Sequence, residues 1–555
     1  MTKKSNRTFF CISTKELKLI VTFLGASVTA AVVISYRTMQ QHPDSMISGG
    51  LRWLSEGPVS FQYNTYGPFS YFIYGVLSLV YFGLGFLFGF WHSPSEFEIA
   101  YRINSLNFGN LKFSVFYLTL NILMLIQSLN LLMKSSKNSS FRKKLVFVLS
   151  ISTPITLFQF TLETVEPVVF FGISLTIYTF SNAQKLINTP KLLFLLSTLS
   201  WLFTFGVRIS TLPIVLLYSL ASAIDMKQVK EKTLLYSALT FAVLVSIASY
   251  SPVFLDRENF EYVISLNRLL ATSSFKISTI TDNLETFKLN LGFWIPLLIV
   301  AMIYSIKMWK KENIFIRTRI ILILLFSSLY LVNQNGHPKY LIPLIPLVFS
   351  LMMDLELPKS EKNGFLINQK VRAGCFSIVL LVGGLQATRT AGDFIANSNF
   401  DSRQEVKKFI LKFPDWTSSI LVTDNVLAEI TRGPDPRDYT SLRKEVFLGD
   451  RNQACAGVLV LSSTSYSRDE AQKRLLECKR VGTINYLVTI SPFNSSQLPQ
   501  GKKHWRALLS LGTSEDVNRI GYGPVYWVGV YRDFNGSTSD PDLCSNIKGC
   551  KFSRF

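Results

Sequence analysis

Charged residues are scarce in this sequence. They make up 17% of its 555 residues, while hydrophobic residues make up 48%. A soluble domain usually carries about 25% charged residues. The composition therefore argues against an aqueous globule, and equally against a secreted disulfide miniprotein or a disordered chain.

Histidine and cysteine are also few, at four and six residues. Neither shows the spacing of a zinc site, so no metal site is expected from them. The sequence lacks a Walker A lysine loop, and therefore gives no support to ATP-driven transport. It also lacks an evident internal repeat of the kind from which many secondary transporters are built.

Lys and Arg exceed Asp and Glu, 57 to 36, which gives a net charge of +21. Most of this excess lies in loops between long apolar runs, where a membrane orientation signal belongs. A nucleic-acid partner is therefore not expected.

Long apolar runs dominate residues 1–390, and many are long enough to cross ~30 Å of hydrocarbon. They cover residues 17–36, 109–133, 145–162, 167–184, 192–207, 210–225, 232–252, 290–308, 318–334, 340–356 and 372–388. The first run has no small-residue cleavage site after it, so we interpret it as a span and not as a signal peptide. The sequence predicts a mainly α, polytopic helical membrane protein with about 11 spans.

Clusters of Lys and Arg set the expected orientation, because they favour the cytoplasmic side. They lie before the first span, at 134–144, at 185–191, at 227–232, at 307–319 and at 359–372. If residues 67–91 crossed once, every cluster after the first would face outward. We therefore predict that 67–91 is a re-entrant or juxtamembrane helix on the outer side; an ordinary span that breaks the charge rule is the alternative.

Residues 391–555 have mixed polarity and are expected to form a small extracytoplasmic α/β domain. Strand-like runs occur at 419–423, 457–461, 486–490 and 525–531, and helical spacing at 402–413 and 468–481. The tail also holds Cys455, Cys478, Cys544 and Cys550, which could pair outside the cell; their pairing stays open.

Acidic residues beside the membrane are candidates for chemistry, because ionisable groups there need a partner or a function. Asp44 follows the first span and could take a proton from a substrate hydroxyl, cap a helix, or lie in a solvated turn. Glu163 and Glu166 are three residues apart in a short external turn. They could bind a divalent cation such as Mg²⁺ or Mn²⁺, orient a sugar hydroxyl, hold a basic side chain, or face solvent.

Basic residues on the same predicted side suggest an anion such as a phosphate. Arg208 separates two half-length apolar runs, where a fixed charge often faces a water-filled cavity. His337 and Lys339 lie at another external helix junction, and Arg102 lies in the long first external segment. The alternatives are a salt bridge for Arg208 and snorkelling for Lys339.

These motifs, in this order, resemble the GT-C superfamily of polytopic glycosyltransferases, in the branch of protein O-mannosyltransferases and lipid A aminoarabinose transferases. Asp44 stands at the place of the family's acid in its first external loop. Residues 65–71 (TYGPFSY), which include Tyr66, look like the start of its juxtamembrane helix. The further similarities are 100–106 with Arg102, Glu163 or Glu166 as the second acid, 206–213 with Arg208, and 337–346 with His337, Lys339 and Tyr340.

The resemblance implies an inverting transfer of a sugar from a polyprenyl-phosphate donor to a glycan, lipid or protein hydroxyl, in a bacterial inner membrane. It implies Asp44 as the catalytic base. Arg208, His337 and Lys339 would contact the phosphate, and Arg102 would either assist there or hold Asp44 in place. Glu163, Glu166, Tyr66 and Tyr340 would contact substrate. No cofactor is firmly expected. The alternatives are a secondary transporter, a non-catalytic membrane protein with a partner-binding tail, and another lipid-linked glycan enzyme.

Overall fold

The computed structural model describes the chain in separate stretches. They are residues 46, 50, 53–54, 57–58, 66–89, 91–93, 97, 111–136, 140–160, 164–257, 260–261, 277–292, 294–307, 309, 313–332, 338–354, 378, 381–391, 420–423, 460–461, 486–489, 505–511 and 528–533. The predicted first span, the predicted tail helices and the four tail cysteines lie outside these residues.

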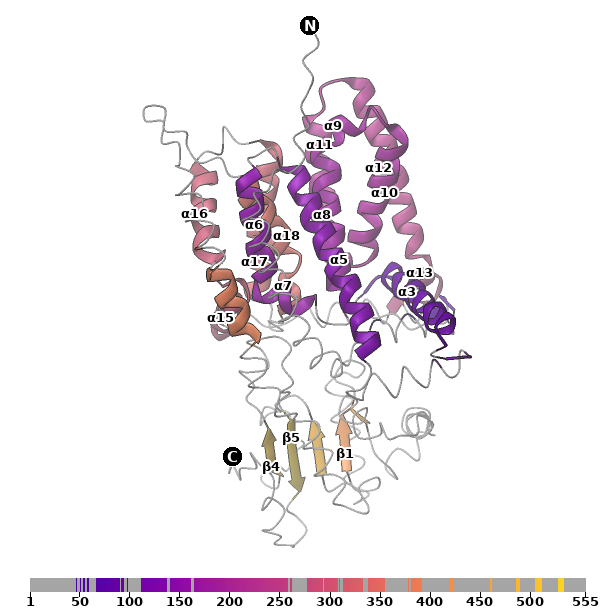
Figure 1. Ribbon diagram of the computed structural model, residues 1–555, viewed down its shortest axis with the longest axis vertical. Coiled ribbons are helices and arrows are strands. Elements are labelled where there is room, and N and C mark those ends of the chain that lie inside the picture. The colour runs from indigo at the N-terminus through magenta and orange to yellow at the C-terminus, as the bar shows by residue number, and fades with distance from the viewer. Residues whose placement is uncertain are drawn as a thin grey trace.

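Helices make up nearly all of the described part before residue 392, and most run along the long axis in Figure 1. The α-helices are α3 (Pro68–Leu87), α5 (Leu111–Ser135), α6 (Ser140–Ser152), α7 (Pro154–Gln159), α8 (Glu166–Ser181), α9 (Ala183–Leu186), α10 (Pro190–Trp201), α11 (Leu212–Asp225), α12 (Val229–Ser249), α13 (Ser251–Leu255), α15 (Ile277–Leu291), α16 (Trp294–Lys307), α17 (Ile314–Val332) and α18 (Leu344–Asp354). A π-helix, η2 (Leu202–Gly206), and two 3-10 helices, η3 (Ile209–Thr211) and η5 (Pro338–Leu341), complete the set.

The core of this bundle is α8, which packs against α5, α10, α11 and α18. Its sequence is apolar on all sides, and such a helix is stable only when it is enclosed on all sides. Pro167 lies in its first turn, where the missing backbone N–H costs nothing. Helix α18 is enclosed in the same way, since all residues from Leu344 to Met353 are buried.

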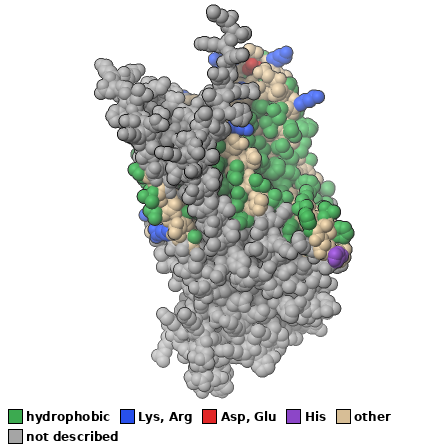
Figure 2. Space-filling model, in the orientation of Figure 1, with side chains coloured by type: hydrophobic (Ala, Val, Ile, Leu, Met, Phe, Trp, Pro, Cys, Tyr) green, Lys and Arg blue, Asp and Glu red, His purple; other side chains and the backbone are tan. Residues whose placement is uncertain are grey.

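The outer surface of the bundle is apolar. On α12 the buried residues include Ala238, Ala242 and Ser246, whereas Leu244 and Ile247 are 61% and 50% exposed. Small residues inside and large apolar residues outside are the reverse of a soluble protein and suit a lipid environment. Figure 2 shows the same pattern, with hydrophobic side chains over the exposed middle of the helices and Lys or Arg near their upper and lower ends.

Four described helices are long and apolar enough to cross a membrane, and this agrees with the expected helical membrane protein. They are Pro68–Leu87, Leu118–Ser135, Val229–Ser249 and Ile314–Val332. Shorter apolar helices occupy Glu166–Ser181, Pro190–Gly206, Ile209–Asp225 and Leu344–Asp354. Helix α15 was not expected from the sequence, because its buried face carries Asn283, Thr286 and Asn290 and so interrupts the apolar pattern.

The two ends of the bundle differ in charge. Helix α10 runs toward Arg208, and α11 runs away from it in the reverse direction. The start of α10 and the end of α11 therefore lie together, at the end of the bundle opposite to Arg208. Gln184, on α9, donates to the backbone oxygen of Asp225 at the end of α11 (3.0 Å), which confirms that these segments meet. Five lysines lie at this side: Lys227 lies between α11 and α12, Lys185 lies on α9, and Lys191, Lys230 and Lys232 lie in the first turns of α10 and α12. We call the two ends the Arg208 end and the lysine end.

Helix α3 lies at the Arg208 end. It packs on η2, the Gly67 N–H before it donates to the Val207 oxygen (2.8 Å), and the Tyr74 hydroxyl donates to the Thr164 oxygen (2.5 Å). In Figure 1 it is drawn across the lower end of the long helices. After α3 the chain turns back, and the Trp91 indole donates to the Phe82 oxygen at 2.8 Å.

Beyond residue 391 the structure describes five strands. They are β1 (Ile420–Thr423), β2 (Val460–Leu461), β3 (Tyr486–Thr489), β4 (Trp505–Leu511) and β5 (Val528–Asp533). Their order in the sheet is β2-β1-β3-β5-β4. The strand β1 pairs in parallel with β2 and β3, while β5 pairs antiparallel with β3 and β4. Strand β4 was not expected from the sequence.

Candidate functional site

The chain is broken between α10 and α11, and Arg208 lies in the break. The last turn of α10 widens into the π-helix η2, Arg208 itself is extended (φ −150°, ψ 113°), and the 3-10 helix η3 follows. Short π-segments occur often at functional sites, since they change the direction of the side chains that follow. A break at membrane depth also exposes backbone carbonyl groups, and these must find donors within the protein.

Donors from three elements satisfy the carbonyl groups of this break. Thr204 O accepts from the Arg208 N–H (3.1 Å) and from the Thr211 hydroxyl (2.8 Å). Phe205 O accepts from the Tyr250 hydroxyl at 2.8 Å. Val207 O accepts from Gly67 N–H. These hydrogen bonds hold the break to its neighbours and fix the backbone that carries Arg208.

Two glycines allow other elements to touch the break closely. A Cβ on Gly67 would lie 2.1 Å from the Gly206 oxygen, and a Cβ on Gly172, in α8, would lie 2.3 Å from the Phe203 oxygen. No side chain fits at either distance. Glycine at these two positions is thus required for the contact of α3 and α8 with η2, as is usual where membrane helices approach closely.

Glu166 is the acidic partner of Arg208. Its carboxylate is fully buried at the start of α8, and the Arg208 guanidinium is 7% exposed, with 3.8 Å between Nη1 and Oε1. At that distance the two charges attract without a hydrogen bond. Both carboxylate oxygens and Arg208 Nη1 have no hydrogen-bond partner among the described residues. Such groups are costly to bury, so a ligand or water is expected to complete them.

Lys339 and two tyrosines complete the cluster. The Arg208 guanidinium carbon lies 5.2 Å from the centre of the Tyr340 ring, and Lys339 Nζ lies 5.8 Å from the same centre. Lys339 Nζ is also 5.9 Å from the centre of the Tyr66 ring, and Tyr66 is buried. Among the described residues, two cations and one carboxylate thus gather at the Arg208 end. This arrangement favours an anionic ligand, and a phosphate suits both cation types.

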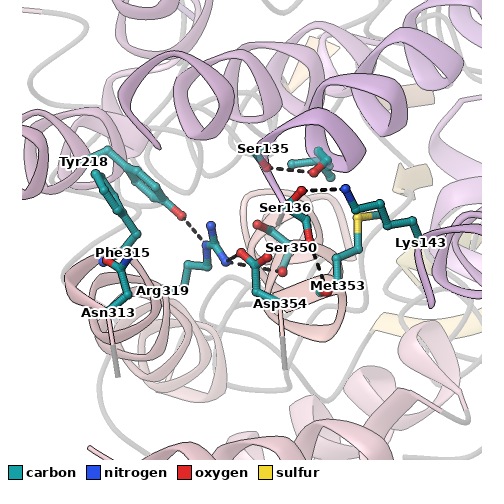
Figure 3. A network of polar contacts seen from close by, with 11 residues as sticks. Ser135, Ser136, Lys143, Tyr218, Asn313, Phe315, Arg319, Ser350, Met353 and Asp354 are labelled. Carbon is teal, nitrogen blue, oxygen red and sulfur yellow. Dashed lines mark hydrogen bonds and ion pairs between the residues drawn. The ribbon is translucent and has the colours of Figure 1, made fainter. Parts of the chain in front are cut away.

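A second polar network lies at the lysine end (Figure 3). Arg319, on α17, forms a buried ion pair with Asp354 at the end of α18, and its Nε donates to the Tyr218 hydroxyl of α11 at 3.0 Å. Nearby, the Ser136 hydroxyl donates to Met353 O at 3.2 Å. This network joins α5, α11, α17 and α18.

Lys143 belongs to the same end. Its ammonium donates to the Ser136 backbone oxygen. Burial lowers the pKa of Lys143, and of the charges near it Asp354 raises this pKa while Lys185 lowers it. The start of α6, the end of α18 and α9 therefore lie at the same end of the bundle, which agrees with the chain directions.

The structure brings together five of the nine residues that the sequence suggested. Tyr66, Glu166, Arg208, Lys339 and Tyr340 are linked by the ion pair and the cation–ring contacts above. The other four, Asp44, Arg102, Glu163 and His337, lie outside the described residues. Their proposed roles, and the question whether they join the cluster, stay predictions.

Sequence reasoning missed several residues that hold or adjoin this cluster. Gly67, Gly172 and Tyr250 shape the break through contacts between distant parts of the chain, and no local pattern announces such contacts. Gln159 was detectable, because a buried amide inside the apolar run 145–162 is unusual at membrane depth. It is fully buried on α7.

In the described part of the chain, no three His, Cys, Asp or Glu side chains lie close enough together to bind a metal ion. A divalent cation at Glu163 and Glu166 stays a prediction. No protein-family model matches the sequence, and no curated protein matches it.

Proposed function

We propose that this protein is a membrane glycosyltransferase that transfers a sugar from a polyprenyl-phosphate donor to an acceptor hydroxyl, with inversion at the anomeric carbon. The observation that carries the proposal is the gathering of Arg208 and Lys339 around the Tyr340 ring, beside the buried carboxylate of Glu166. A lipid-linked phosphate keeps its tail in the bilayer and needs fixed cations at a helix end.

The proposed orientation follows from the charge difference between the two ends. The loops of the lysine end would face the cytoplasm, and the Arg208 end would face outward. The chain would cross about 11 times, with α3 on the outer side, and residues 391–555 would form an extracytoplasmic α/β domain that covers the site. A bacterial inner membrane is the expected location.

In the proposed reaction an acceptor oxygen attacks the anomeric carbon as the bond from that carbon to the phosphate oxygen breaks. The bonding electrons leave with the phosphate, and Arg208 and Lys339 stabilise the charge that develops there. Asp44 takes the proton of the acceptor hydroxyl. Arg102 and His337 would assist at the phosphate, and Glu163 would contact substrate. The acceptor is a glycan, a lipid or a protein.

A secondary transporter is the second candidate, because a charged residue between two broken helices is also typical of transporters. Unlike the transferase, a transporter requires that its substrate can also reach Arg208 from the lysine end. The ion pair between Arg319 and Asp354 joins the helices there. Flux of a lipid-linked or anionic substrate without chemical change would favour the transporter.

The test uses undecaprenyl phosphate and the purified full-length protein in lipid nanodiscs. Saturating lipid at about 100 times its Kd should stabilise the protein by about 2.7 kcal/mol, which is measurable as a thermal shift. Arg208→Met and Lys339→Met should lose this shift. Lys191→Met, which removes an exposed charge at the lysine end, should retain it, and the uncharged alcohol undecaprenol should give none.

Turnover is measured as release of undecaprenyl phosphate from undecaprenyl-phosphate sugars in membranes that contain acceptors. Release that depends on Arg208 and Lys339 supports the transferase. If the lipid binds equally well to wild type and to both variants, the assignment of the anion site is wrong.

A further inference from the structure

Two polar side chains on α7 lack hydrogen-bond partners. Gln159 is fully buried and Thr156 is 1% exposed. Neither the amide oxygen nor the amide nitrogen of Gln159, nor the Thr156 hydroxyl, has a partner among the described residues. The two are three residues apart in one helix and therefore share a face. Unsatisfied groups of this kind are rare in native structures and each requires an explanation.

These two side chains lie at the Arg208 end. Phe160, next to Gln159, packs its ring 5.2 Å from that of Phe170, one turn after Glu166 in α8. Helix α7 also packs on α15, and α15 packs on η5, which carries Lys339. Through Phe160 and through α15, helix α7 is thus connected to α8 and η5, the elements that hold Glu166 and Lys339.

The unsatisfied atoms define the chemistry of a ligand. The Glu166 oxygens only accept hydrogen bonds, the Gln159 nitrogen only donates, and the Thr156 hydroxyl does both. A metal ion or an ammonium group would satisfy Glu166 but would leave the Gln159 nitrogen without an acceptor. A carboxylate would satisfy that nitrogen but would be repelled by Glu166. Neighbouring hydroxyl groups satisfy all of these atoms, because each hydroxyl donates and accepts.

We infer that Gln159, Thr156 and Glu166 bind the hydroxyl groups of a neutral sugar, next to the phosphate contacts of Arg208 and Lys339. The inference rests on the proposed function and narrows its substrate class. The donor sugar would carry no carboxylate and no amino group. Gln159 would select it through paired hydrogen bonds to two adjacent hydroxyls.

The experiment compares the binding of four lipids to the full-length protein in nanodiscs. They are undecaprenyl phosphate and undecaprenyl-phosphate glucose, glucuronic acid and aminoarabinose. Wild type should bind the glucose lipid about tenfold more tightly than the bare phosphate, since one good hydrogen bond to a buried group is worth that factor. It should show no such preference for the two charged sugars.

Gln159→Met keeps the length of the side chain and removes the amide. It should abolish the tenfold preference and leave the affinity for undecaprenyl phosphate unchanged. Thr156→Val is a second variant of nearly unchanged shape, with the same expected direction. Gln184→Met is the matched control, because Gln184 is an exposed glutamine at the lysine end; it should keep the preference.

Three results would overturn the inference. In the first, wild type binds a charged sugar lipid most tightly. In the second, both α7 variants retain the full preference and full thermal stability. In the third, both variants retain the full preference but lose thermal stability. The last result would assign the polar face to buried water. Failure of undecaprenyl phosphate to bind wild type would instead refute the proposed function, and the inference with it.

Discussion

Alanine at Gly67 tests whether the close contact of α3 with the break positions Arg208. The backbone of Gly67 (φ −71°, ψ 155°) suits any residue, so alanine brings no backbone strain. Its Cβ, however, would lie 2.1 Å from the Gly206 oxygen and 2.6 Å from the Tyr250 hydroxyl. Since ordinary contacts of this kind are about 3.5 Å long, the two segments must separate by more than about 1 Å.

The magnitude follows from the bonds that this separation breaks. The hydrogen bond from Gly67 N–H to Val207 O is 2.8 Å long and would exceed the limit of about 3.5 Å. One unsatisfied buried carbonyl costs about 1–3 kcal/mol, and the forced contact costs a similar amount. We expect Gly67→Ala to lose about 2–6 kcal/mol of stability. A Cβ on Gly172 would meet the Phe203 oxygen, so Gly172→Ala should lose a similar amount of stability.

Gly83→Ala is the control, because a Cβ there meets nothing within 4 Å. Gly83 lies inside α3, where alanine should be neutral or gain up to about 1 kcal/mol. The assay is the thermal unfolding midpoint in nanodiscs, followed by titration with undecaprenyl phosphate. Gly67→Ala should weaken lipid binding and Gly83→Ala should not. Equal midpoints and equal affinities in the two variants would refute the reasoning.

Two further changes test the lysine end and the position of α3. Asp354→Leu or Arg319→Met alone leaves a buried charge without its partner and should lower the free energy of unfolding by about 3 kcal/mol. The double variant should recover most of this loss, as measured by thermal unfolding. Additive losses would show that the pair is not coupled. In a chain without its six native cysteines, His92→Cys should react with a membrane-impermeant maleimide on intact cells, and Lys230→Cys only after permeabilisation. Labelling of His92→Cys only after permeabilisation would show that α3 crosses.

Apolar length predicted most of the helices, because a lipid-exposed helix must be apolar over its whole exposed surface. The runs 167–184 and 232–252 correspond to α8 and α12 within a few residues. Helix α15 was not predicted from the sequence, for the opposite reason. Its Asn283 and Asn290 are buried against other protein segments, so no run of apolar residues marks it.

The candidate site could be predicted only in part. A cation between two half-length apolar runs indicated the break at Arg208, and the order of motifs suggested that Lys339 and Tyr340 would join it. The π-helix and its donors could not be foreseen, because the Tyr250 hydroxyl and the Gly67 N–H reach it from distant parts of the chain. Contacts of that kind follow from packing and leave no periodic signal.

Helix α18 links the two polar clusters and bears on the choice between enzyme and transporter. It spans 11 residues, or about 16 Å. Lys339 and Tyr340 precede it, and Asp354 at its other end is bound to Arg319. Because α18 is buried along its length, a separation of α17 from α18 at the lysine end would break this ion pair. Under the proposed function, this ion pair at the lysine end favours a reaction at the Arg208 end over alternating access.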